Sequence, residues 1–506
     1  MNAEQKRLKS ISKGDDSWRK WGTYLAERAW GTVREDYSAG GTAWDYFPHD
    51  HARSRAYRWN EDGLLGFCDD GGYLCFGLSL WNGEDAILKE RAFGLNNTEG
   101  NHGEDVKEYF YYLDNLPTHS YCRALYKYPQ SAFPYSDLVN ENKSRGQNTP
   151  EYELIDTGVF DQNRYFDVQV EYAKNTPTDI LIQISVTNRG GESARLELLP
   201  TFTFRNIWDW KHPSTRPQMK AVSDEMVQME HHFLGNYTLY CQSGAELLFT
   251  ENHTNDQRLY QSPNDSPYVK DAFHEYLIQE NKNAINPQRC GTKMAARYTL
   301  QIEAEETQKV LLRLVEQSEE NPTKSTFSAV SKDFDAILQK RRTESDAFYD
   351  DIAGCKNEDT KAVQRQALAG LLWCKQFYHY DVERWLEGDP TEPLPPQSRL
   401  HGRNHDWIHL NNHDVISMPD SWEYPWYASW DLAFHCVTMA MIDADFAKNQ
   451  LILFLREWYQ HPNGQIPAYE WAFSDVNPPV HAWAALRVFR MEKKRSGSGD
   501  YDFLER

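Results

Sequence analysis

Residues 165–198 read YFDVQVEYAKNTPTDILIQISVTNRGGESARLEL, and they decide the fold class of the N-terminal part of the chain. Apolar and polar side chains alternate over residues 165–172 and again over residues 179–188. A period of two places one side of a strand against a core and the other side toward water. A turn signal, Asn188–Gly191, follows, and the alternation then resumes. The apolar positions are Phe166, Val168, Val170, Tyr172, Ile180, Ile182, Ile184, Val186, Ala194, Leu196 and Leu198.

The same alternation returns over residues 298–302 and 310–314, which we predict to form a later hairpin. Many half-buried strands separated by turn signals are typical of a sandwich of antiparallel sheets. We therefore predict a β-sandwich-like N-terminal domain over residues 1–320. The apolar positions of the predicted hairpin are Tyr298, Leu300, Ile302, Val310, Leu312 and Leu314.

The pattern changes at Asn321–Pro322. Residues 321–357 are polar with sparse apolar positions and predict a helical linker, and residues 358–506 carry helical spacing. We expect helices over residues 428–441, 443–459 and 479–490, with a long loop over residues 388–425 that is interrupted by proline and glycine. One further helix face is predicted from steps of three and four through Val363, Ala367, Leu371, Cys374 and Tyr378.

The end of the sequence also carries a prediction. Asp500 is suited to cap a last helix. The chain stops at Arg506 after about two turns at most, and so short a helix is marginal in isolation. We expect the chain to be the N-terminal portion of a longer protein; a frayed natural C-terminus is the alternative.

The composition limits the class of function. The 506 residues carry a formal net charge of −21, which disfavours nucleic acids and polyanionic substrates. Aromatic residues make up 14% of the chain, and their flat faces complement the C–H face of a sugar ring, although they also fill large cores. No stretch predicts a signal peptide or a membrane span, and the eight cysteines form no CxxC pair. We expect a cytoplasmic protein with reduced cysteines and no cofactor.

Several common catalytic motifs are absent from the sequence: GxSxG, GxxxxGK, GxGxxG and HExxH. His401, His405, His409 and His413 recur every four residues and would line one face of a helix, where they could bind a metal. Proline and glycine around them indicate a loop instead. We therefore predict no metal site there.

The strongest local signal for a function is the stretch DSWEYPWYASWDLAF at residues 420–434. A helix that begins near Ala428 or Ser429 places Asp431 in its first turn, where the helix dipole favours a carboxylate. Asp431 could then accept hydrogen bonds from two sugar hydroxyls while an indole covers the ring. The alternative is that Asp431 only supports the start of the helix. The predicted substrate-binding residues are Asp431, Trp430, Trp426 and Tyr424.

A second mixed stretch, NGQIPAYEWAFSDVNPPVHAW, spans residues 463–483. Polar side chains are unfavourable to bury unpaired, so their mixture with aromatic residues indicates a hydrated cleft or a polar ligand. A well hydrogen-bonded loop is the alternative. The predicted substrate-binding residues here are Glu470, Trp471, Asn477, His481 and Trp483.

Both stretches resemble the catalytic domain of glycoside hydrolases related to family sixty-three, the processing alpha-glucosidases and mannosylglycerate hydrolases. The likeness rests on the spaced Trp422, Trp426 and Trp430 before Asp431, and on Asn477-Pro478-Pro479 leading to Trp483. It implies an (α/α)6 toroid, incomplete in this chain, and inverting hydrolysis of alpha-linked glucosides or mannosides by an acid and a base. It also implies that Asp431 lies in the subsite of the cleaved sugar.

No position of this sequence matches either catalytic carboxylate motif of that family, so the catalytic residues stay unknown. We therefore expect the complete protein to be a glycosidase acting on an oligosaccharide or small glycoside, and this chain alone to be inactive. A non-catalytic carbohydrate-binding protein of the same ancestry is the alternative. An unrelated aromatic-rich structural protein is a third possibility, and such a protein would show no sugar binding in a titration.

Overall fold

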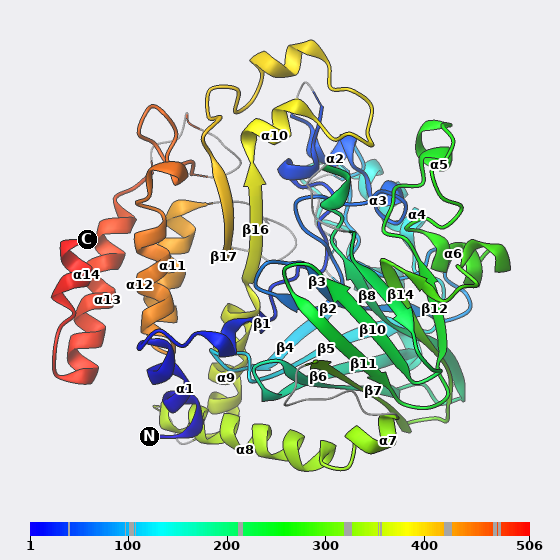
Figure 1. The fold of residues 1–506 in the computed structure, drawn as a ribbon, viewed down its shortest axis with the longest axis horizontal. Coiled ribbons are helices and arrows are strands. Elements are labelled where there is room, and N and C mark those ends of the chain that lie inside the picture. Colours follow the sequence, from blue (N-terminus) through cyan, green and yellow to red (C-terminus); the bar gives the residue numbers. More distant parts are fainter. Residues whose placement is uncertain are drawn as a thin grey trace.

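A computed structural model shows two large antiparallel sheets followed by a long hairpin and a group of helices (Figure 1). The structure describes residues 1–38, 41–96, 98–100, 106, 108–210, 216–317, 326–352, 354, 357–418, 428–468, 473 and 477–506.

Two sheets form the N-terminal part, and every strand pair in them is antiparallel. The six-stranded sheet consists, in spatial order, of β1 (Trp21–Gly22), β2 (Leu64–Asp69), β3 (Leu74–Trp81), β8 (Ala194–Phe204), β14 (Lys293–Ile302) and β12 (Glu246–Thr250). The nine-stranded sheet consists of β13 (Cys290–Gly291), β9 (Gln218–Ala221), β10 (Met226–His231), β11 (Gly235–Cys241), β15 (Thr307–Glu316), β7 (Asp179–Asn188), β6 (Tyr165–Thr176), β5 (Tyr121–Pro129) and β4 (Phe110–Asn115).

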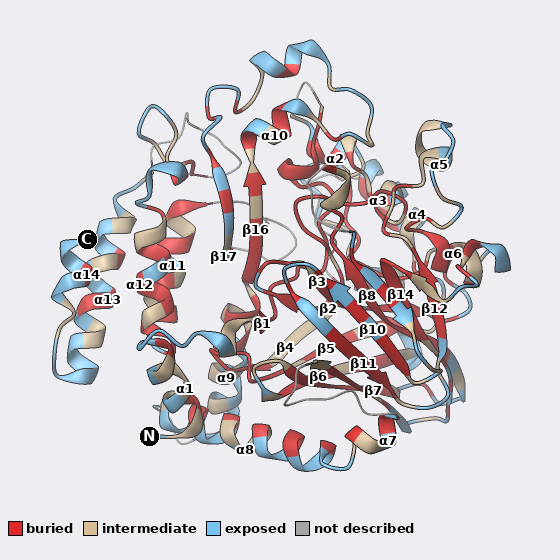
Figure 2. Cartoon of the chain, in the orientation of Figure 1, coloured by how far each residue is buried: buried red, intermediate tan, exposed pale blue. Residues whose placement is uncertain are grey.

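The largest hydrophobic core contains buried residues of both sheets. On β6, the predicted inward face is fully buried, from Phe166 to Tyr172, and on β7 the same holds from Ile180 to Val186. Across the core these side chains meet the six-stranded sheet; Phe76 lies 5.9 Å from Tyr172, ring centroid to ring centroid. Figure 2 shows many buried residues along the strands of the two sheets. The prediction of a large antiparallel β domain is confirmed.

The predicted hairpin over residues 298–314 is wrong. β14 pairs with β8 and β12, whereas β15 pairs with β7 and β11 in the other sheet. Both strands bury one face, as the alternation indicates. Alternation identifies the buried face of a strand but not the sheet that contributes it, because two packed sheets bury inward faces of the same character.

Helices also occur in and around the β domain, which the alternation did not reveal. Most are short and lie in the connections between strands, whereas α8 and α9 run along the nine-stranded sheet (Figure 1). They are α1 (Ala3–Ile11), α2 (Ala43–Tyr46), α3 (His49–Ala52), α4 (Tyr135–Ser144), α5 (Asp256–Tyr260), α6 (Ala272–Leu277), α7 (Phe327–Val330), α8 (Phe334–Ile352) and α9 (Glu358–Trp373).

The predicted helix face through Tyr378 is wrong beyond Trp373. Helix α9 ends there, and the chain continues as strand β16 (Lys375–Asp381), which pairs with β17 (Asn411–Ser417). Strand β17 lies inside the region predicted to be a loop. Val363 is 68% exposed, so the buried face of α9 is not the predicted one but that of Leu368 and Leu372. The pairing partner of β16 follows about thirty residues later, after the short helix α10 (Val382–Glu387).

The C-terminal helices agree with the predicted segments. They are α11 (Ser429–Met439), α12 (Ala444–Leu453), α13 (Val480–Ser496) and α14 (Tyr501–Glu505). Helix α11 packs against α12 and α13, and Asp500 caps α14 by accepting from the amide of Phe503. These helices lie on the side of the hairpin away from the sheets (Figure 1). The predicted (α/α)6 toroid is not confirmed.

Among the described residues, no helix has the length and apolar character that crossing a membrane requires. Within the same residues, no cluster of histidine, cysteine and acidic side chains is arranged to hold a metal. The described cysteines are all free thiols.

Candidate functional site

The start of helix α11 places Asp431 where the sequence predicted it. Ala428 is the N-cap in an extended conformation, and Asp431 is the third residue of the helix. The unpaired amides of a first helical turn attract a carboxylate. Burial raises the pKa of Asp431, and a backbone hydrogen bond offsets part of that effect. No described cation forms an ion pair with this half-buried carboxylate.

An aromatic row extends from this point across two helices. The ring of Trp430 lies 6.1 Å from Phe434 on α11, and Phe434 lies 5.7 Å from Trp483 on α13, both edge to face. Phe434 and Trp483 are 46% and 47% exposed. The structure thus brings together two predicted residues that are more than fifty positions apart, and it adds Phe434. The i, i+4 spacing of Trp430 and Phe434 was the signal in the sequence that could have identified it.

Two other predicted residues contact the backbone instead. His481, near the start of α13, lies with Nε2 2.9 Å from the carbonyl of Leu451 on α12. Burial lowers the pKa of His481, so the ring is neutral at pH 7. Asn477 donates to the carbonyl of Ile466. His481 thus links α13 to α12, and Asn477 links two parts of the loop between these helices, which is the hydrogen-bonded alternative that the sequence left open.

The remaining predicted residues, Tyr424, Trp426, Glu470 and Trp471, lie outside the described residues, as does Trp422.

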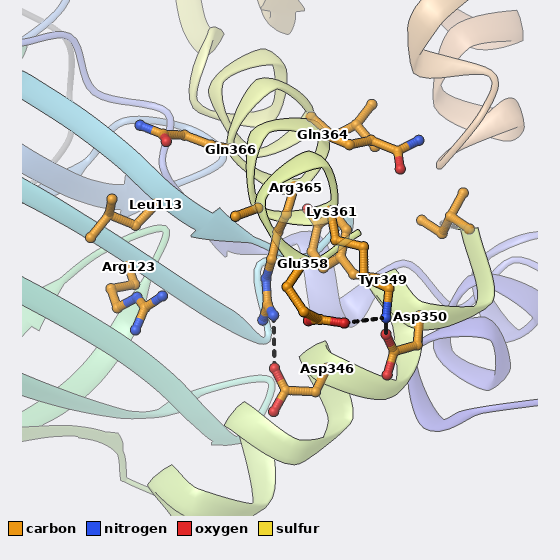
Figure 3. Close-up of a pocket in the computed structure, with 13 residues that line it drawn as sticks. Leu113, Arg123, Asp346, Tyr349, Asp350, Glu358, Lys361, Gln364, Arg365 and Gln366 are labelled. Atoms are coloured by element: carbon orange, nitrogen blue, oxygen red, sulfur yellow. Dashed lines mark hydrogen bonds and ion pairs between the residues drawn. The ribbon is translucent and has the colours of Figure 1, made fainter. Parts of the chain in front are cut away.

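The pocket in Figure 3 has a volume of about 500 Å³ and lies between α8, α9 and the edge of the nine-stranded sheet. Five of its six charged side chains form ion pairs with each other. Lys361 lies 3.3 Å from Asp350 and 3.2 Å from Glu358, and Arg365 lies 2.7 Å from Asp346. The pairs with Asp350 and Asp346 join α9 to α8, whereas the pair with Glu358 lies within α9. None of the predicted substrate-binding residues lines this pocket.

Comparison with known proteins gives a relative in Saccharomyces cerevisiae, an uncharacterized protein. It is 44% identical over 544 residues, which cover 99% of this chain and 50% of the relative. The chain therefore spans about half the length of the curated relative it matches. No protein-family profile matches the chain.

Solved structures show only distant likeness. A protein described as a kojibiose phosphorylase from the human microbiome has a TM-score of 0.20 and 11% identity, covering 78% of this chain and 43% of that one. A family 92 glycosyl hydrolase has a TM-score of 0.27 and 11% identity, covering 95% and 60%. A protein described as an aldose 1-epimerase from Escherichia coli K12 has a TM-score of 0.20 and 9% identity, covering 40% and 67%.

Proposed function

We propose that this chain is part of a carbohydrate-active enzyme, an inverting glycoside hydrolase that cleaves alpha-linked glucosides or mannosides. The observation that carries the proposal is the half-buried carboxylate of Asp431, which no described cation neutralises, in the first turn of α11 beside Trp430. A carboxylate accepts two hydrogen bonds from neighbouring hydroxyls of a pyranose, and an indole packs on the C–H face of the same ring.

The role proposed for Asp431 is to hold the sugar whose bond is cleaved. Its carboxylate must be ionised to accept both hydroxyls, and burial makes that state less favourable in the empty protein. Hydrogen bonds from a ligand reverse this penalty. Such a carboxylate is better explained by a ligand than by support of the helix, which an uncharged cap would provide without desolvating a charge.

Inversion requires two carboxyl groups about 6.5–9.5 Å apart, with a water between one of them and the sugar. We propose that they lie in further helices of the complete protein, which would also cover the exposed apolar side chains of the helical part. Those exposed side chains include Phe434, Met441, Leu455, Trp458, Trp483 and Leu486.

The test uses the full-length protein and a panel of aryl alpha-glucosides, aryl alpha-mannosides and the corresponding disaccharides. Asp431→Asn keeps the shape and removes the charge. Charge-assisted hydrogen bonds contribute about 1.5–3 kcal/mol each, so kcat/KM should fall by about tenfold or more.

The matched control is Asp445→Asn, an aspartate in the first turn of the neighbouring α12, which lies 3.4 Å from Lys448. We expect it to leave the kinetics unchanged. If the two substitutions lowered kcat/KM equally, Asp431 would only support the start of α11 and would not bind the sugar. Binding of the glycosides without any turnover would instead favour the non-catalytic carbohydrate-binding protein.

A further inference from the structure

A cleft of about 240 Å³ lies where the β16–β17 hairpin meets the β domain. None of the predicted substrate-binding residues lines it. Of its lining residues, the sequence singled out only His413, as part of a possible metal-binding run. Most of the others come from turns and strand ends far apart in the sequence.

One wall of the cleft is a single face of the hairpin. His379 of β16 is paired with His413 of β17, and Asp381 is paired with Asn411. Because side chains alternate along a strand, residues two apart on each strand share a face, so all four side chains project together. This face carries two imidazoles, a carboxylate and an amide.

A second wall of the cleft is formed by aromatic rings of the β domain. Tyr73 stacks on Phe233 with ring centroids 5.4 Å apart, and Tyr73 lies 6.3 Å from His413. Trp210 lies 5.8 Å from His379. Phe233 is 58% exposed and Trp210 is nearly buried. The lining of the cleft therefore combines flat apolar surfaces with hydrogen-bonding groups.

Arg205 is a buried cation that also lines the cleft. Its guanidinium donates to the carbonyls of Gly71, Gly72 and Arg58 and, at 3.1 Å, to Nδ1 of His379. No described carboxylate lies within ion-pair distance of it. Burial of His379, followed by the charge of Arg205, holds the pKa of His379 well below its ordinary value. His379 is thus neutral, accepts at Nδ1 and carries its proton on Nε2.

The hairpin is seated on the turn that holds Arg205. Gly72 has a φ of +57°, and a Cβ atom at this position would lie 2.6 Å from the ring of Phe377 on β16. Only glycine adopts this φ without strain and also leaves room for the ring of Phe377. The position of the guanidinium is therefore set by the same contact that brings the two walls together.

A second arginine, Arg384, lies beside the aromatic wall of the cleft. The guanidinium of Arg384 lies 4.8 Å from the ring centroid of Trp210, and its Nε is 4.0 Å from Asp381. Asp381 also caps α10 by accepting from the amide of Arg384. Burial, followed by the charge of Arg205, lowers the pKa of His413, so this imidazole is neutral as well at pH 7. Two arginines and one aspartate line the cleft, so the lining has a net positive charge, although the chain carries a net charge of −21.

We propose that this cleft binds a single sugar ring that bears one anionic group. The aromatic wall packs on the C–H face of the ring, the imidazoles and Asn411 bond to its hydroxyls, and Arg205 and Arg384 attract its charge. The volume is below the range of about 300–1,000 Å³ that is usual for drug-sized ligands, so it suits one ring rather than a chain of sugars.

The test is a calorimetric titration of the full chain with three sugars of the same ring size: glucuronate, glucose 6-phosphate and glucose. We expect at least one of the two anionic sugars to bind more tightly than glucose. The tighter of the two identifies the group as a carboxylate or a phosphate. The proposal is overturned if neither anionic sugar binds, or if glucose binds as tightly as both.

Variants test whether binding occurs in this cleft. Arg384→Gln should weaken binding of the anionic sugar by about tenfold, the loss expected for one charge-assisted hydrogen bond. Phe233→Ser, at an exposed position that leaves the core intact, should weaken binding of glucose and of the anionic sugars by a similar factor. Unchanged affinity in both variants would overturn the proposed location.

The matched control is Arg145→Gln. Arg145 lies 4.9 Å from the ring centroid of Tyr152 and pairs with Glu141, and its side chain is 22% exposed, against 29% for Arg384. This substitution removes a guanidinium that, like that of Arg384, lies over an aromatic ring and pairs with a carboxylate, but that is far from the cleft in the sequence. We expect the affinity to remain unchanged, and a loss equal to that of Arg384→Gln would show that general charge, not the cleft, attracts the sugar. Asp431→Asn should also leave this binding unchanged, so the two proposals fail separately.

Discussion

Asp443 joins three parts of the chain that are far apart in the sequence. It receives two hydrogen bonds from Arg19, at 2.7 and 2.6 Å, and lies 3.7 Å from Lys375 of β16. It also caps α12 by accepting from the amide of Phe446 at 3.1 Å. Only 1% of its side chain is exposed. Burial by itself would raise the pKa of Asp443, but the charges of Arg19 and Lys375 outweigh burial and hold the pKa below its usual value.

Replacement of this aspartate by asparagine separates the charge from the cap. Asp443→Asn retains an oxygen for the amide of Phe446 but leaves Arg19 and Lys375 without their anion. Loss of one partner of a buried ion pair typically lowers the free energy of unfolding by about 3–5 kcal/mol. We expect a loss of that size at pH 7, measured by urea unfolding followed by tryptophan fluorescence.

The control is Asp500→Asn. Asp500 caps α14 by accepting from the amide of Phe503 at 3.1 Å and pairs with Lys448 at 2.8 Å, but its side chain is 36% exposed. Its loss should lower the free energy of unfolding by at most about 1 kcal/mol, because solvent screens exposed pairs. The two substitutions therefore differ mainly in burial.

The pH dependence gives an independent check. Because the folded-state pKa of Asp443 is depressed, its contribution is complete above the unfolded pKa of about 3.9 and is lost as the pH falls through the folded value. The difference between the wild type and Asp443→Asn should therefore be constant from pH 7 to pH 5 and shrink below about pH 4. Equal losses for Asp443→Asn and Asp500→Asn at pH 7 would refute the reasoning.

Three further predictions follow from other residues. Asp431→Asn should not lower the free energy of unfolding of this chain at pH 7, because burial disfavours the ionised carboxylate; a loss above about 1 kcal/mol in urea unfolding would make Asp431 a helix-start residue. Burial, followed by the charge of Lys375, holds the pKa of His119 well below its ordinary value, so the folded state stays neutral while the unfolded state binds a proton below about pH 6.5. The stability advantage of the wild type over His119→Asn should therefore shrink by up to about 1.4 kcal/mol per pH unit from pH 6.5 downward, and parallel profiles would contradict this. The 506-residue chain alone should not hydrolyse aryl glycosides, and turnover that survives repurification would show that the catalytic carboxylates lie within it.

Much of the local structure was predictable from the sequence. Alternation identified β6 and β7 and their buried face from Phe166 onward, because a strand with one face in a core repeats every second residue. The helix start at Ser429 and the position of Asp431 in its first turn also follow from local rules. These features depend on contacts between residues that are close in the chain.

The tertiary structure decided which elements meet. The placement of β14 and β15 in opposite sheets and the pairing of β16 with β17 depend on partners remote in sequence. The cleft is likewise assembled from a turn at Tyr73, the end of β8 at Arg205 and the hairpin at His379. Each of these residues is ordinary in its own segment, and long-range contacts such as that of Phe377 with Gly72 bring them to one place. Local propensity determined the elements of this protein, whereas long-range packing determined where its polar and aromatic side chains converge.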